Sequence, residues 1–331
     1  MDTNGKVLRL GTAAILCALI FRLFSSGIPG MLLSWILQPD MTAFLIYLET
    51  GRDVRFLPST QVFSPDFAPE SPAPLPLEET RERPAFSAED ANLVDVYYAC
   101  DLRPNIGMLL EETLQWDLTG QEPTVLILHT HTTESYTKSV ESYQETAAYR
   151  TLDENYNMLS IGDAVGRILA ENGITAVHDR LLHDYPSYNG SYNDARKSIA
   201  AYLEAYPSIR LVLDLHRDAA DTPNGQLRTV AQVEGQSAAQ LMLVMGTDAA
   251  GLSHPDWEEN LSVAVKLHAL LERQSPGIMR PLILRAQRFN QDMSPGALLV
   301  EVGAAGNTHA EALRAAGQLA EAIVALSQGS E

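Results

Sequence analysis

The sequence predicts an α/β fold in which a mainly parallel sheet is flanked by helices. Short apolar runs of strand length recur along the C-terminal two thirds of the chain, and amphipathic helical segments alternate with them. Three of these runs, 125–128, 209–215 and 297–303, end in or carry His or Glu. Because parallel strands joined by helices share one carboxyl edge, we expect these polar residues to gather there.

Composition narrows the range of functions. The chain has 331 residues and a formal net charge of -19, and this charge excludes a nucleic-acid partner because phosphate binding needs clustered Lys and Arg. Its only two cysteines, Cys17 and Cys100, lie far apart in sequence and in different kinds of segment. We therefore expect neither an intrachain disulfide nor a thiolate metal site.

Residues 1–40 are predicted to form an N-terminal membrane anchor. The segment 7–37 is apolar with few charges, Arg22 lies where it can snorkel to the headgroups, and Lys6 and Arg9 favour an N-in orientation. A cleaved signal peptide and a helix of the soluble core are the alternatives. The anchor is preferred because no cleavage site of the A-x-A kind follows.

Residues 41–119 are predicted to be a linker and stalk. Proline fixes φ and removes a hydrogen-bond donor, so a proline-rich stretch is extended and semi-rigid. Within this region, 41–52 has the spacing of an amphipathic helix, and 91–111 is compatible with a short element at the edge of the next domain. The prolines of the stalk are Pro58, Pro65, Pro69, Pro72, Pro74, Pro76 and Pro84.

Residues 120–331 are predicted to form the catalytic domain. Apolar runs bounded by turn residues predict strands, and apolar residues at 3.6-residue spacing predict helices. The predicted strands are 125–128, 174–177, 209–215, 240–245, 282–284 and 297–303. The predicted helices are 157–170, 193–205, 257–273 and 310–326.

The candidate metal ligands follow the strand at 125. His129, His131 and Glu134 lie within six residues, and imidazole and carboxylate are donors that zinc uses. In an extended segment, His129 and His131 point to the same side. A second strand ends at His216, which supplies a further imidazole, so the sequence predicts a three-ligand metal site with an open position for water.

Two other residues are candidates for the chemistry. Glu301 lies among apolar neighbours in its strand, and burial of a lone carboxylate raises its pKa toward the range of a general base. Arg217, beside His216, or Arg285, ahead of the strand at 297, is expected either to steady an oxyanion or a substrate carboxylate, or to form a structural ion pair.

Four segments in the order found here resemble the stage II sporulation protein P family and span about residues 120–325. They are His129 to Tyr136, Val177 to Asp179 with His183 to Tyr192, Leu213 to Asp218, and Asn290-Gln291 through Glu301-Val302-Gly303 with Asn307-Thr308. The resemblance implies an amidase-like fold and a bacterial peptidoglycan hydrolase related to the zinc-dependent N-acetylmuramoyl-L-alanine amidases.

By this resemblance, one Zn²⁺ per chain is held by His131 or His129, by His216 and by a Glu, and Glu301 acts in catalysis. The relatives' ligand Glu opens the helix after the first strand, which corresponds here to the region of Asp153. We prefer Glu134, since it lies in the same loop as the histidines.

The resemblance also implies a setting and partners. It predicts an amidase, with endopeptidase action as a further possibility, that degrades septal peptidoglycan during sporulation engulfment together with the sporulation proteins D and M. With the N-terminal anchor, the catalytic domain is expected to lie outside the cell membrane. The alternative is a non-catalytic, metal-stabilised protein that binds the cell wall or acts as a scaffold.

Overall fold

The computed structural model describes residues 60–65, 83–114, 117–137, 149–222 and 225–327. Contacts divide the chain into Met1–Pro58 and Ser59–Glu331, and the described residues all belong to the second unit. The predicted anchor at 1–40 and the predicted amphipathic helix at 41–52 lie outside them. Within the described ranges, no helix has the length and apolar character needed to cross a membrane.

An eight-stranded sheet forms the centre of this unit, in the order β1-β4-β3-β5-β12-β10-β11-β2. Five of its seven neighbouring pairs are parallel, and the two antiparallel pairs are β1 with β4 and β10 with β12. The mainly parallel sheet is therefore confirmed. The strands are β1 (Thr60–Phe63), β2 (Val96–Tyr98), β3 (Gly120–Leu128), β4 (Ile174–Asp179), β5 (Leu211–Asp218), β10 (Leu241–Gly246), β11 (Leu282–Arg285) and β12 (Ala297–Ala304).

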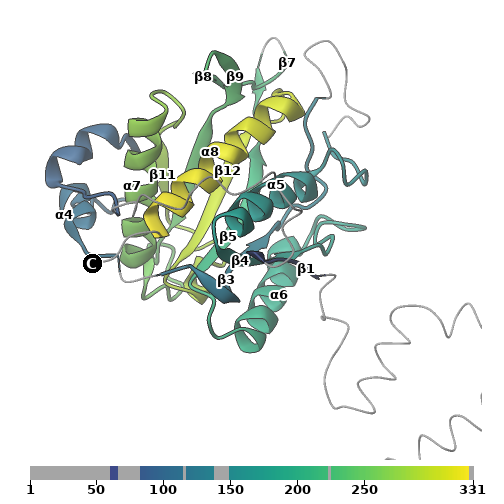
Figure 1. Cartoon of the computed structure of the whole chain (residues 1–331), viewed down its shortest axis with the longest axis horizontal. Coiled ribbons are helices and arrows are strands. Elements are labelled where there is room, and N and C mark those ends of the chain that lie inside the picture. Colours follow the sequence, from purple (N-terminus) through teal and green to yellow (C-terminus); the bar gives the residue numbers. More distant parts are fainter. Residues whose placement is uncertain (1–59, 66–82, 115–116, 138–148, 223–224, 328–331) are drawn as a thin grey trace, which may run out of the picture. The chain divides into compact units, whose positions relative to one another are not determined.

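Helices cover both faces of the sheet. α8 (His309–Ser327) lies between α7 (Trp257–Gln274) and α5 (Met158–Glu171) on one face, as Figure 1 shows. Leu126 and Leu128 of β3 instead pack in a separate core with α6 (Ser191–Ala205). Because side chains alternate along a strand, α6 covers the opposite face. The four predicted helices are confirmed to within two residues at either end.

Local signals explain where these elements begin and end. Asn157 caps α5 by accepting a hydrogen bond from the backbone N–H of Leu159 at 3.0 Å. Gly173 follows the helix with a φ of 83°, a conformation that favours glycine and ends the helix as the sequence predicts. β4 then begins at Ile174 and is buried along its whole length.

The domain begins earlier in the chain than the predicted boundary at residue 120. β1 pairs with β4 at one edge of the sheet, and β2 pairs with β11 at the other. The short helix α4 (Ile106–Glu111) packs against α7. These segments are too short to show a hydrophobic period on their own, and their contacts with distant strands and helices place them in the domain.

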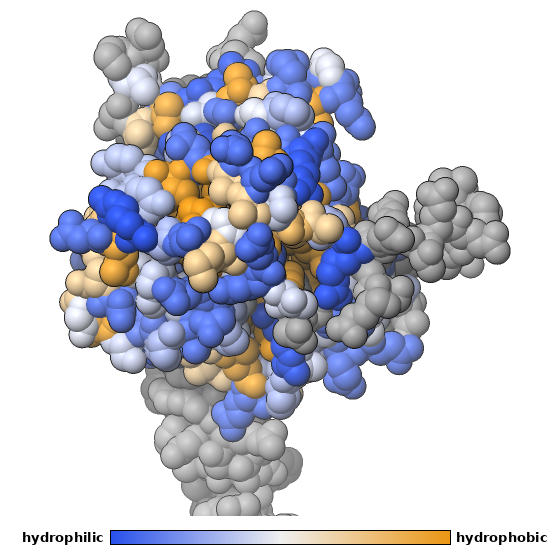
Figure 2. All heavy atoms as spheres, turned by 90° about the vertical axis from the view of Figure 1, so that its left-hand side faces the viewer, coloured by the Kyte–Doolittle hydropathy of each residue, from blue (hydrophilic) through white to orange (hydrophobic). Residues whose placement is uncertain are grey.

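Smaller elements complete the described structure. The two short helices η3 (Ala88–Leu93) and η4 (Gln291–Met293) flank the sheet strands in sequence. Two hairpins follow β5, the first formed by β6 (Asp221–Thr222) and β7 (Gly225–Gln226) and the second by β8 (Val230–Val233) and β9 (Gln236–Ala239). Figure 2 shows the face beside α4, where most residues are hydrophilic and hydrophobic ones form a patch among them. The exposed Met108 of α4 is one of the few large hydrophobic side chains on the described surface.

Candidate active site

The carboxyl ends of β3, β5 and β12 bring the candidate residues together. His216 of β5 and Glu301 of β12 are paired in register across two adjacent parallel strands. Their side chains therefore lie on the same face of the sheet. β3 ends at Leu128, whose register partner in β5 is Asp214, so the segment that follows β3 runs directly over His216.

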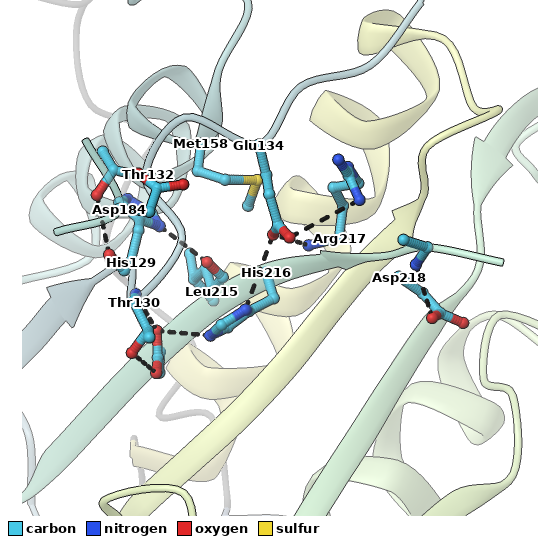
Figure 3. A network of polar contacts seen from close by, with 12 residues as sticks. His129, Thr130, Thr132, Glu134, Met158, Asp184, Leu215, His216, Arg217 and Asp218 are labelled. Carbon is cyan, nitrogen blue, oxygen red and sulfur yellow. Dashed lines mark hydrogen bonds and ion pairs between the residues drawn. The ribbon is translucent and has the colours of Figure 1, made fainter. Parts of the chain in front are cut away.

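His131, Glu134 and His216 form the centre of the site, and Figure 3 shows Glu134 and His216 directed toward one another. The rings of His131 and His216 meet edge to face with centroids 5.3 Å apart. Glu134 Oε2 lies 3.8 Å from His216 Nδ1. All three residues are buried. The structure thus brings together three of the four predicted metal ligands.

Two enclosed polar atoms at this site have no hydrogen-bond partner: His131 Nδ1 and Glu301 Oε2. His216 Nε2 is paired with Asp214 Oδ1 at 2.9 Å. Unsatisfied buried polar atoms are rare in folded proteins because each costs free energy. Their convergence here marks the cluster as a binding or catalytic site.

The surroundings of His216 and His131 shift the pKa values of their imidazoles in opposite directions. Burial acts to lower the pKa of His216, but the carboxylate of Asp214 and then those of Glu134 and Glu301 raise it to about 9. Burial lowers the pKa of His131 to about 4, and the positive charge of His216 adds to this effect. At neutral pH, and with no ion bound, His216 is therefore charged and His131 is neutral.

Glu301 has the environment of a proton carrier. Burial raises the pKa of Glu301 to about 8; His216 opposes this shift and the carboxylate of Glu134 adds to it. Although the residue is partly exposed, its Oε2 is enclosed. A carboxyl group whose pKa lies near neutrality can both accept and donate a proton in one reaction cycle.

The side chains at this site are of the types that bind a metal ion, but their present positions do not form a metal site. Across the described ranges, no group of three or more His, Cys, Asp or Glu side chains is arranged to hold a metal ion. His131 Nδ1 is buried without a hydrogen-bond partner, however, and His216 turns its Nδ1 toward Glu134 Oε2 at 3.8 Å. Imidazole and carboxylate are zinc donors. The side chains would have to close on the ion when it binds.

His129 lies apart from this cluster, contrary to the expectation that it points to the same side as His131. Its Nδ1 is 3.0 Å from the carbonyl of Leu215, and its Nε2 is 2.8 Å from His178 Nε2. The expectation was wrong because β3 ends at Leu128, so the alternation of an extended strand does not continue to His131.

The side chain of Arg217 makes its contacts with other residues of the protein. The residue is 3% exposed, and its guanidinium donates to the carbonyls of Ser135 at 3.2 Å and Tyr149 at 2.8 Å. It also lies 3.7 Å from Glu134 Oε1. Of the two predicted roles, these contacts favour the structural ion pair over contact with a substrate.

Asp153 and Arg285, the other two residues considered from the sequence, lie away from this cluster. Asp153 accepts hydrogen bonds from the backbone N–H and the side chain of Asn155 in the turn before α5. Arg285 ends β11, which runs parallel to β10 and hence opposite to β12. Arg285 therefore lies at the edge of the sheet opposite Glu301. Glu134, not Asp153, is the carboxylate beside the histidines.

Three residues outside the set of candidate ligands and catalytic residues also line the site. Tyr188 stacks on His131 with ring centroids 4.6 Å apart, and Tyr192 packs against both His131 and His216. Asp214 faces His216 from two positions earlier in β5. The two-residue spacing from His216 could have identified Asp214, since i and i+2 in a strand share a face. The two tyrosines lie in the turn-rich segment 183–192 that carries part of the family resemblance, where the sequence is compatible with both loop packing and the lining of a groove.

Comparisons with known proteins agree with the sequence motifs. A relative, stage II sporulation protein P of Bacillus subtilis (strain 168), is 29% identical over 214 residues, which are 61% of this chain and 51% of the relative. This chain thus spans about half the length of that relative. An N-acetylmuramoyl-L-alanine amidase structure from Clostridium difficile 630 matches 61% of this chain and 93% of its own, at 17% identity and a TM-score of 0.34. The sequence model of the family "Stage II sporulation protein P" matches residues 75–324. Since this match covers more than half of the 331 residues, the chain belongs to the stage II sporulation protein P family.

Proposed function

We propose that the chain is a metal-dependent peptidoglycan hydrolase, an N-acetylmuramoyl-L-alanine amidase, that acts in septal cell-wall degradation during sporulation engulfment. The observation that carries this proposal is the enclosed, unpartnered Oε2 of Glu301 beside His131, Glu134 and His216. A binding protein has no need of a carboxyl group held near neutrality next to zinc-type donors. Membership of the family supports the sporulation setting.

The proposed cofactor is one Zn²⁺ per chain, held by His131, Glu134 and His216. When bound, zinc lowers the pKa of a coordinated water and polarises the carbonyl of the scissile amide. Asp214, which is held by the backbone N–H and hydroxyl of Thr130 at 2.8 Å and 2.6 Å, orients the His216 ring from behind.

Proton transfer is assigned to Glu301. Its Oε2 takes a proton from the attacking water and delivers it to the nitrogen of the leaving amine, which is the amino group of L-alanine in the proposed reaction. Arg217 takes no part in this transfer. By holding the carbonyls of Ser135 and Tyr149, it keeps the loop that carries Glu134 against β5.

Zinc content tests the ligand assignment. We expect elemental analysis of the purified full chain to find close to one zinc per chain and His216→Ala to lose it, because three donors are needed for tight binding. His131→Asn should lose zinc as well. The control is His129→Asn, which should keep it, since both ring nitrogens of His129 contact other residues of the protein. Loss of zinc from His129→Asn but not from His131→Asn would reverse the assignment.

Glu301→Gln tests whether the site is catalytic. Removing a general base typically lowers a rate by about 10²–10⁴-fold, so the variant should keep its zinc and bind purified peptidoglycan while releasing product that much more slowly. The control Glu321→Gln makes the same chemical change on the exposed side of α8 and should release product at the wild-type rate. Binding without release by the wild type and both variants would instead favour the scaffold alternative.

The cellular arrangement is proposed on the sequence and the family resemblance. The N-terminal segment 1–40 anchors the chain in the cell membrane, the proline-rich region spaces the domain from the bilayer, and the domain acts on the extracytoplasmic side. The proposed partners are the sporulation proteins D and M. Cleavage of peptide cross-links is a second activity that the same site would perform, since an amide is the scissile group in both reactions.

A further inference from the structure

A pair of histidines lies on the face of the sheet opposite the candidate site. His129 and His178 are both fully buried, and their rings meet edge to face with Nε2 atoms 2.8 Å apart. The pair is enclosed by α5 at Gly162, where an added Cβ would lie 2.5 Å from His178 Nε2 and 2.8 Å from His129 Nε2. Only glycine leaves room for this contact.

The side chain of His129 extends the hydrogen bonding between β3 and β5 beyond the last pair of backbone partners. The ladder extends to Leu128 and Asp214, after which the chain leaves the sheet. Beyond that point, His129 Nδ1 lies 3.0 Å from the carbonyl of Leu215, and the backbone N–H of Thr130 donates to Asp214 Oδ1 at 2.8 Å. Figure 3 shows His129 directed toward Leu215, next to His216. Two side chains thus continue the connection that the strands no longer make.

The partners of His129 determine which ring nitrogen carries its hydrogen. A carbonyl only accepts, so the contact with Leu215 requires a hydrogen on Nδ1. The two Nε2 atoms of His129 and His178 share one hydrogen across 2.8 Å, so one of them donates and the other accepts. His178 Nδ1 lies 2.9 Å from Asp163 Oδ1, and this contact turns the Nε2 of His178 toward His129. Arg180 donates to the same Asp163 oxygen at 2.6 Å.

We propose that His178, oriented by Asp163, is a positioning residue that holds the ring of His129 with its Nδ1–H directed at the carbonyl of Leu215. The resulting bond to Leu215 fixes the start of the loop that carries His131 and Glu134 against the strand that carries His216. This hydrogen bond therefore sets the separation between the two halves of the candidate site. The expected effect on activity rests on the proposed function, whereas the tautomer does not.

The tautomer can be measured directly. In long-range ¹H–¹⁵N spectra of the full chain with ¹⁵N-labelled histidine, the signals that disappear in His129→Asn belong to His129. We expect them to show a hydrogen on Nδ1, which the more common form of a free neutral imidazole lacks. A protonated Nε2 with an unprotonated Nδ1 would overturn the proposal.

Matched amide substitutions separate the hydrogen bonds from simple packing. An Asn side chain places its amide nitrogen where histidine has Nδ1, and Gln places it where histidine has Nε2. His129→Asn keeps a donor toward Leu215 and His129→Gln does not. For His178 the order is reversed, because Gln keeps the donor toward His129 and Asn keeps only the contact with Asp163.

We expect His129→Gln and His178→Asn to release product from peptidoglycan about 10–100-fold more slowly than His129→Asn and His178→Gln, as is typical when a partner that orients metal ligands is lost. Thermal unfolding is measured in parallel. Equal rates within each pair at equal stability would overturn the proposal, because packing alone would then explain the histidines. If the wild type released no product, the proposed function would be wrong. The spectra of His129 would still show whether its Nδ1 carries the hydrogen that the proposal requires.

Discussion

At the scale of single residues, Arg217 lies next to the candidate ligand His216 but has a structural role, since its contacts are with the protein. Its guanidinium reaches the carbonyls of Ser135 and Tyr149, which lie on either side of residues 138–148 in sequence, and it lies 3.7 Å from Glu134. A planar fork with several donors suits this arrangement, whereas a lysine ammonium does not. The residue thereby connects β5 to the loop that supplies Glu134.

The variant Arg217→Lys tests this role. Losing buried, charge-assisted hydrogen bonds should lower the free energy of unfolding by about 3 kcal/mol, measured by chemical denaturation. Arg314→Lys is the matched control on the exposed side of α8, where Arg314 donates to Gln236 and Ser237, and it should change stability by no more than about 0.5 kcal/mol. Unchanged stability with a lost rate in Arg217→Lys would instead indicate a contact with substrate.

Most of the site could be predicted from the sequence, but the position of His129 could not. His131, Glu134, His216 and Glu301 meet as expected because each follows or ends a strand at the same edge. His129 does not join them, because the end of β3 at Leu128 depends on hydrogen bonds to Leu215 and Asp214, which are far away in sequence. Such contacts leave no signal in local spacing.

At the scale of elements, the interior of α7 carries a titratable group that weakens the fold in acid. His268 is 2% exposed, and its Nδ1 has no hydrogen-bond partner. Burial lowers its pKa to about 4, with Glu272 and Asp95 opposing the shift. Between pH 6.5 and 4 the unfolded chain therefore binds a proton that the folded chain does not, and stability falls as the pH falls through this window.

The variant His268→Leu tests this linkage. Removing the group should leave the acid sensitivity from all other residues, so the variant should lose about 2–3 kcal/mol less stability than the wild type between pH 7 and pH 4.5. Urea unfolding at the two pH values gives the difference. Parallel losses in the two proteins would mean that His268 is protonated in the folded helix.

At the scale of the whole molecule, the strands and helices of the domain could be predicted from the sequence, but the directions of some strands in the sheet could not. The alternation of strands and helices from 125 to 326 gave the expected elements, since each carries its own hydrophobic period. The reversal of β10, β11 and β2 relative to β12 was not predicted, because no local pattern distinguishes a parallel from an antiparallel neighbour for a buried strand. This reversal places the carboxyl ends of β10, β11 and β2 at the edge of the sheet opposite the candidate site.

The reaction that we propose for this edge of the sheet is cleavage of the amide between the muramoyl lactyl group and L-alanine. The most direct test is to identify the new end groups after the full chain has digested purified peptidoglycan, with Glu301→Gln as the blank. We expect L-alanine amino termini to appear with the wild type and to be about 10²–10⁴-fold slower to form with the variant. New reducing sugar ends without new L-alanine amino termini, or equal release by both proteins, would contradict the claim.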